Sequence, residues 1–75
     1  MTSLLDMPSG EKGIISAIHG GYGLTQKLEN MGFRIGKEIV KVNKQWRRGP
    51  IIVQSGNSQV ALGHGIARRI MVEIQ

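Results

Sequence analysis

The stretch Leu24-Thr25-Gln26-Lys27-Leu28-Glu29-Asn30-Met31-Gly32-Phe33 decides the fold of this chain. Three of its residues, Leu24, Leu28 and Met31, stand at positions i, i+4 and i+7 and therefore share one face of a two-turn helix. We predict a helix over residues 24–31. A helix this short is not stable alone, so it must dock on another element through that apolar face.

Both ends of this helix carry turn glycines. Gly32 suits the left-handed conformation that ends many helices, and Phe33 can then fold back onto Leu28. Gly20 and Gly21 belong to the loop His19-Gly20-Gly21-Tyr22-Gly23, which we predict to be a tight or flexible turn before the helix. A glycine loop before a helix can also cradle a phosphate. A turn that leads into a docked helix explains these glycines without a ligand.

Outside the helix, short β-branched segments separated by glycines predict a small β protein. Glycine is used 11 times in 75 residues, about twice its usual share. Gly36 and Gly49 stand in turns before strands, and Gly56-Asn57 predicts a two-residue hairpin turn. Strands are predicted at residues 13–18, 38–42, 51–54, 59–62 and 70–74, with one helical turn within 63–69. We predict a single domain over residues 1–75, an SH3-like β-barrel of about five strands with an irregular lead-in over residues 1–12.

Composition narrows the environment and the partners. Ten Lys and Arg residues against five acids give a formal charge of +5, which favours an acidic protein, a nucleic acid or an anionic membrane surface, or simply a solvated basic face. The chain has no cysteine, which excludes disulfides and thiolate metal sites. No signal-peptide pattern opens the sequence, and no apolar run approaches the ~18 residues of a membrane span. We expect a soluble, cytoplasmic protein that does not insert into the membrane.

The sequence offers neither a catalytic set nor a strong metal site. We find no arrangement of nucleophile, base and orienting residue, and we predict that the chain is not an enzyme. His19 and His64 are the best metal donors, but a specific transition-metal site usually needs three or four convergent ligands. We therefore expect no cofactor, although an adventitious zinc or iron ion could bridge two molecules through a histidine. Weak binding of a transition metal stays open as an alternative function.

The segment Lys44-Gln45-Trp46-Arg47-Arg48 joins an aromatic side chain to three cations. Such a composition is typical of interface hot spots, although Trp46 could instead fold back over the barrel. Binding of single-stranded nucleic acid ranks second, because such binders usually need several stacking aromatic residues along a basic groove. Tyr22, Leu24 and Met31 are candidates for a second, apolar contact surface. Free sheet edges offer strand addition, including self-association.

Four segments of the chain follow one another in the order of a known family: Leu4-x-x-Met7-x-x-Gly10-Glu11-x-Gly13-x-Ile15; Gly20-Gly21 with Leu28-Glu29-x-Met31-Gly32-Phe33-x-x-Gly36; Gly49-Pro50-Ile51-x-Val53; and Val60-Ala61-Leu62-Gly63 with Ala67-x-x-Ile70-x-Val72. Together they resemble the FeoA-type ferrous iron transport accessory proteins over essentially the whole chain. The chain departs from the common pattern at Trp46-Arg47-Arg48 and at His64-Gly65.

The resemblance implies a non-catalytic cytoplasmic protein that binds and regulates FeoB, a membrane transporter of ferrous iron with a cytoplasmic GTPase domain. Iron is then the cargo of the system and not a ligand of this chain. On this basis we expect the partner to contact Trp46, Arg47 and Arg48, or Tyr22, Leu24 and Met31. Gly20, Gly21, Gly32, Gly36 and Gly49 are expected to act as turn or helix-stop residues.

Overall fold

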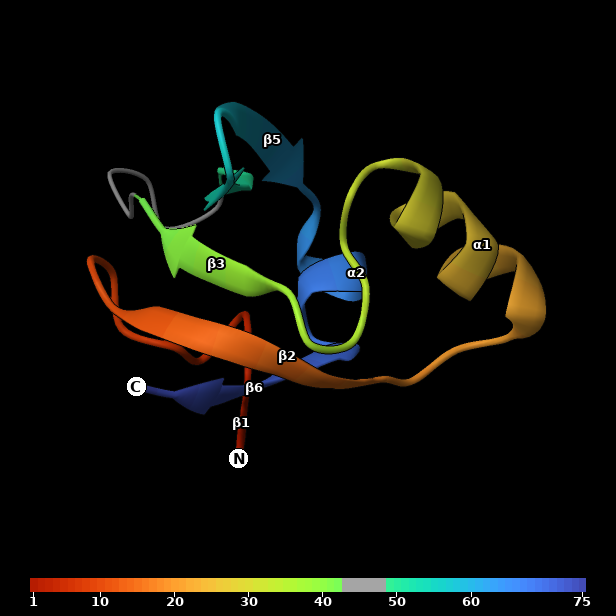
Figure 1. Ribbon diagram of the computed structural model, residues 1–75, viewed down its shortest axis with the longest axis horizontal. Helices are drawn as coiled ribbons and strands as arrows, with labels where there is room; N and C mark the ends of the chain where they lie inside the picture. Colours follow the sequence, from red (N-terminus) through yellow and green to blue (C-terminus); the bar gives the residue numbers. More distant parts are fainter. Residues whose placement is uncertain (43–48) are drawn as a thin grey trace.

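A computed structural model describes residues 1–42 and 49–75 of the chain. The described residues form one antiparallel sheet with two short helices (Figure 1). The strands lie in the order β1-β6-β2-β3-β4-β5. Their bounds are Thr2–Ser3 (β1), Lys12–Ile18 (β2), Glu38–Lys41 (β3), Ile51–Ser55 (β4), Ser58–Leu62 (β5) and Ile70–Ile74 (β6), and the helices are Tyr22–Asn30 (α1) and His64–Ala67 (α2).

The five predicted strands and the helical turn are confirmed, with ends that differ by a residue at most. The two-residue hairpin turn at Gly56-Asn57 is also confirmed, because Ser55 pairs with Ser58. Gly56 has φ of +64°, as the first central residue of a type II′ turn requires. Local sequence decides these features, since β-branched runs and turn glycines need no distant partner.

The prediction of an irregular lead-in over residues 1–12 is wrong at both ends. Thr2 and Ser3 form a sixth strand, which pairs with Val72 and Met71 of β6, and Lys12 already belongs to β2. A two-residue strand has no sequence pattern of its own. It forms because β6 offers a free edge, and the main-chain N–H of Leu4 then donates to the carbonyl of Ile70 at 2.8 Å.

Helix α1 begins two residues earlier than predicted and ends one residue earlier, at Asn30. Tyr22 and Gly23, which we assigned to the loop, form its first turn, and the N–H of Thr25 donates to the carbonyl of the N-cap Gly21. At the other end the N–H of Phe33 donates to the carbonyl of Leu28 at 2.8 Å. The N–H of Gly32 donates to Glu29 at 3.0 Å. This pair of bonds is the Schellman stop, and Gly32 supplies its positive φ of +96°.

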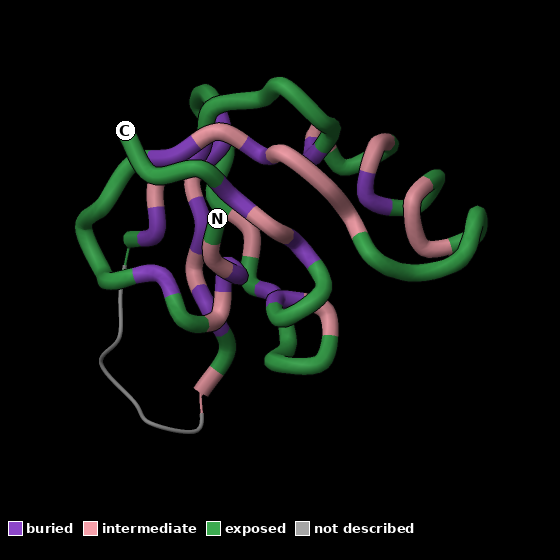
Figure 2. The backbone as a smooth tube through the Cα atoms, turned by 90° about the horizontal axis from the view of Figure 1, so that it is seen from below, coloured by how far each residue is buried: buried purple, intermediate pink, exposed green. Residues whose placement is uncertain are grey.

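The core is enclosed mainly by the strands, and each helix contributes one buried side chain. Phe33, Leu28, Ile15 and Val72 are fully buried, and the same cluster contains residues from the lead-in, every strand from β2 to β6, and α2. Figure 2 shows that burial concentrates on the sheet, whereas α1 has one buried position, Leu28. Helix α1 stands to one side of the sheet (Figure 1). It docks through Leu28 and the half-buried Leu24, whereas Met31, the third residue of the predicted apolar face, is 37% exposed.

Among the described residues, one charged side chain lies in this core. Lys41 and Ile39 lie on the same, inner face of β3, and Lys41 is only 5% exposed. Its ammonium group donates hydrogen bonds to the main-chain carbonyls of Leu5 at 2.8 Å and Met7 at 2.6 Å. Through these two hydrogen bonds Lys41 connects the lead-in to the sheet, next to the buried side chains of Leu4 and Met7.

Candidate partner-binding surface

The turn that follows α1 presents an exposed apolar side chain on a rigid base. The N–H of Lys37 donates to the carbonyl of Arg34 at 3.0 Å, and Gly36 has φ of +94°, as in a type II turn. Gly36 and Lys37 also exchange main-chain hydrogen bonds with Ile15 of β2, at 2.8 and 3.0 Å. Ile35 stands at the tip of this turn and is 64% exposed. An aliphatic side chain is thus held in solvent by bonds to the central strand.

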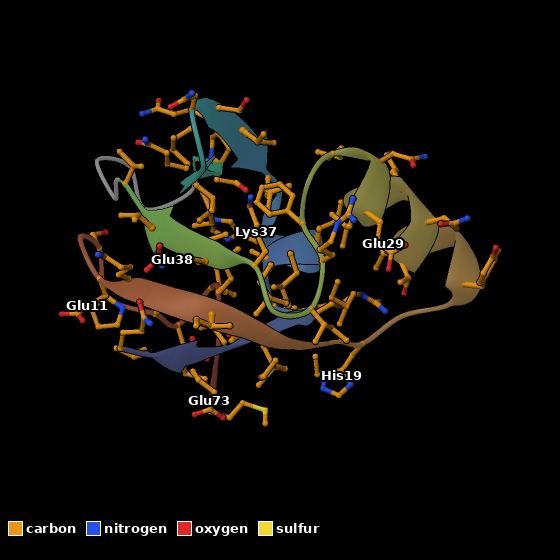
Figure 3. All side chains as sticks on the ribbon, viewed as in Figure 1. Glu11, His19, Glu29, Lys37, Glu38 and Glu73 are labelled. Carbon is orange, nitrogen blue, oxygen red and sulfur yellow. The ribbon has the colours of Figure 1, made fainter. Side chains whose placement is uncertain are left out.

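Basic residues flank this apolar tip along the chain, in the last turn of α1 and in the turn itself. Lys27, Arg34 and Lys37 are exposed, and Met31 at the end of α1 is 37% exposed. The guanidinium of Arg34 donates to the carbonyl of Glu29 at 3.4 Å, where a cation also interacts favourably with the helix dipole. We call the set Lys27, Met31, Arg34, Ile35 and Lys37 the helix-exit surface. Figure 3 shows Lys37 on the α1 side of the sheet, away from Glu11 and Glu73.

The structure separates two of the residues that we predicted to act together. Tyr22 is 80% exposed, and its hydroxyl accepts a hydrogen bond from Gln26 at 3.1 Å. It lies at the start of α1, about 14 Å along the helix axis from Met31 and on the opposite side of the helix. Leu24 is half-buried and packs against the core. Of the apolar candidates on α1, only Met31 therefore lies in the helix-exit surface.

The other predicted contact residues, Trp46, Arg47 and Arg48, lie outside the described residues. Gly49, which follows them, is half-buried, and its carbonyl accepts a hydrogen bond from Nε2 of His64 at 2.9 Å. His64 thus links the first turn of α2 to the residue that precedes Pro50. No local pattern indicates this contact, because the two residues are 15 positions apart.

The two histidines lie at separate places in the described structure. Within residues 1–42 and 49–75, no group of three or more His, Asp or Glu side chains could hold a metal ion. His19 is exposed at the end of β2 (Figure 3). Because Nε2 of His64 donates to Gly49, only Nδ1 of that ring has a lone pair to offer a metal.

The glycines predicted to be structural take different roles. Gly32 and Gly36 occupy left-handed positions, whereas Gly21 is the N-cap of α1 with φ of −76°. At Gly20 a Cβ atom would lie 2.6 Å from Cδ2 of Leu24, so this glycine makes room for the docked helix. Gly13 was not predicted to be a site residue, but it has close backbone contact with β6. A Cβ atom at this position would lie 2.9 Å from the carbonyl oxygen of Glu73.

Arg34, Ile35 and Lys37 are not among the contact residues predicted from the sequence. Ile35 lies between Arg34 and the turn glycine Gly36, outside every predicted strand. This position in a polar turn is the one sequence signal that its side chain is exposed. Neither α1 nor α2, the helices of the described part of the chain, is long and apolar enough to cross a membrane.

Three comparisons relate this chain to known proteins. A candidate Fe(2+) transport protein A of Methanocaldococcus jannaschii is 39% identical over 64 residues, which are 85% of this chain and 76% of that protein. The crystal structure of an iron uptake regulatory protein, FeoA, has a TM-score of 0.88 and 38% identity and covers 99% of this chain and 96% of its own.

A third relative is FeoA of Stenotrophomonas maltophilia, crystallised with zinc. Its TM-score is 0.82 at 25% identity, over 97% of this chain and 91% of its own. That protein is described as a procaryotic SH3 domain protein and a candidate activating factor of bacterial ferrous iron transport. The SH3-like fold predicted from the sequence is therefore confirmed. The model of the FeoA domain matches residues 2–74, and the chain belongs to the FeoA family.

Proposed function

We propose that this chain is a non-catalytic cytoplasmic accessory protein of ferrous iron uptake, which binds the cytoplasmic part of a FeoB-type GTPase transporter and regulates it. The observation that carries this proposal is the match of the FeoA domain over residues 2–74. The names of its relatives, a candidate Fe(2+) transport protein and a candidate transport-activating factor, support it.

We assign the contact to the helix-exit surface. Ile35 offers an apolar anchor that the fold holds rigidly, and interfaces concentrate their binding energy in such anchors. The cations around it favour a partner with an acidic rim, because opposite charges steer association and fix its orientation. Trp46, Arg47 and Arg48 form the second contact that the sequence predicts.

A binding assay with the purified cytoplasmic domain of the transporter tests both assignments. Ile35→Glu and Arg34→Glu should each weaken binding by about tenfold or more, as expected for a hot spot that loses about 1.4 kcal/mol. Ile74→Glu and Arg69→Glu are matched controls, because they make the same changes at exposed positions outside the helix-exit surface. Trp46→Ala combined with Arg48→Glu tests the second contact.

The outcomes separate the function from the surface. If the wild-type chain fails to bind under every nucleotide and iron condition, the adaptor function is wrong. If the wild type binds and Ile35→Glu binds equally well, the function stands and the assignment of the helix-exit surface is wrong.

The charge of +5 favours one alternative, the binding of single-stranded nucleic acid. Such binding would weaken steeply with salt, because each neutralised phosphate releases counterions. If a single-stranded oligonucleotide is not retained at low salt, this alternative is excluded.

A further inference from the structure

Strand β5 is a sheet edge whose outward main-chain groups have no partner within the described structure. Ser55 and Ser58 close the hairpin with β4. The carbonyl of Ile52 accepts from Val42 on the β3 side, so the main-chain groups of Val53 face β5 and bond Val60. By this alternation the N–H and C=O groups of Gln59 and Ala61 point away from the sheet. Both residues are exposed.

The two edges of the sheet are not equivalent. The opposite edge is β1, which has two residues, whereas β5 has five. Natural edge strands usually avoid association by being short or by carrying lysine or proline. Ser58-Gln59-Val60-Ala61-Leu62 has no lysine and no proline. Only β5 is thus both long enough to pair and without these protective features.

The charge distribution indicates what this edge can pair with. All 15 charged residues of the chain lie outside residues 49–67, which contain no Lys, Arg, Asp or Glu. Two copies that each carry +5 repel one another, and the β4–β5 hairpin adds no charge of its own to that repulsion. An acidic partner would instead be attracted to the basic faces elsewhere.

We propose that β5 pairs antiparallel with β5 of a second copy of this chain, about a two-fold axis at Val60. In this register Gln59 lies opposite Ala61 of the second copy, and each pair exchanges two main-chain hydrogen bonds. Val60 lies opposite itself in a pair that is not hydrogen-bonded, and the sheet continues through both molecules. A two-fold axis places the same surface on both sides, as in most natural dimers. This inference does not rest on the proposed function.

A charge test addresses the contact in solution. The wild type should show a weak, concentration-dependent dimer in sedimentation equilibrium, with Kd on the order of 100 µM, since the interface is small. The double variant Gln59→Lys, Ala61→Lys puts two lysines directly opposite each other in each of the two hydrogen-bonded pairs. It should weaken the dimer by about tenfold or more, because like charges directly opposite destabilise a sheet. Gln26→Lys with Gln75→Lys adds the same charge at exposed positions on α1 and at the chain end and should leave the dimer nearly unchanged.

A crosslinking test addresses the register. The chain has no cysteine, so a single introduced thiol can form a disulfide only between copies. Opposite residues of a pair that is not hydrogen-bonded have Cα atoms about 4.5 Å apart, within the range of a disulfide. Val60→Cys should therefore give a covalent dimer on mild oxidation. Asn57→Cys, at the exposed tip of the same hairpin, should stay monomeric.

The proposal is overturned if the wild type remains monomeric up to millimolar concentration. It is also overturned if a dimer forms but the lysine pair at 59 and 61 does not weaken it. Because Val60 packs partly against the core, circular dichroism must show that Val60→Cys is folded. If that variant is folded but does not crosslink faster than Asn57→Cys, the register is wrong.

Discussion

The ammonium group of Lys41 lies 2.6 Å from the carbonyl oxygen of Met7, inside the barrel, and donates a hydrogen bond to it. A second bond reaches the carbonyl of Leu5 at 2.8 Å. Buried carbonyls that lose their donor are costly, because the protein interior cannot replace the bond with water. One side chain of β3 thus satisfies main-chain groups of a segment that has little regular structure of its own.

Replacing Lys41 with Met should lower the free energy of unfolding by about 1–3 kcal/mol, because two main-chain carbonyls then lose their donor. Urea denaturation measures this change. Lys12→Met is the matched control: Lys12 is largely exposed and its ion pair with Glu38 spans 3.9 Å, so it should change stability by less than about 0.5 kcal/mol. Equal losses in the two variants would show that the bonds of Lys41 do not hold the lead-in.

Two glycines of the α1 region should respond with opposite signs. Gly32→Ala forces a side chain into a positive φ of +96° and should destabilise the chain by about 1–2 kcal/mol. Gly23→Ala should instead stabilise it by up to about 1 kcal/mol, since alanine favours a helix and its Cβ would meet no atom within 4 Å. Thermal unfolding of both variants tests the pair, and a loss of stability in both would contradict the early start of α1 at Tyr22.

Gly13→Ala should destabilise the sheet by about 1–3 kcal/mol, as expected for overpacking. The reason is the carbonyl oxygen of Glu73, which would lie 2.9 Å from the new Cβ atom and belongs to the backbone of β6. Gly65→Ala in α2 serves as the control, because its Cβ would have nothing within 4 Å. A neutral effect of Gly13→Ala in chemical denaturation would mean that β2 and β6 can move apart at little cost.

His64→Ala should cost about 0.5–1.5 kcal/mol, the usual net value of one hydrogen bond, because Nε2 of His64 donates to the carbonyl of Gly49. His19→Ala should have almost no effect, since His19 is exposed at the end of β2. Denaturant unfolding curves of both variants and of the wild type, recorded at one pH, give the free energies of unfolding to compare. If both variants match the wild type, the contact with Gly49 contributes nothing to stability.

The sequence alone determined the elements whose causes are local. The end of α1 needed only the stretch from Leu28 to Phe33, six residues in which Phe33 donates to Leu28 and Gly32 donates to Glu29 as the two Schellman bonds. The five long strands followed from β-branched runs, and the β4–β5 turn followed from Gly56-Asn57. Family membership was available for the same reason, since the resemblance rests on those glycines and core positions.

Tertiary structure alone decided the features whose causes lie far apart in the chain. A lysine in a strand is expected to face solvent, and Lys41 is buried because carbonyls 34 and 36 residues away accept its bonds. Strand β1 exists only because β6 has a free edge. Whether β5 is an edge depends on the order of all six strands, and the exposure of Ile35 depends on where β2 anchors its turn. Local sequence selects the elements, but hydrogen bonds between distant segments determine which side chains and main-chain groups remain at the surface to meet a partner.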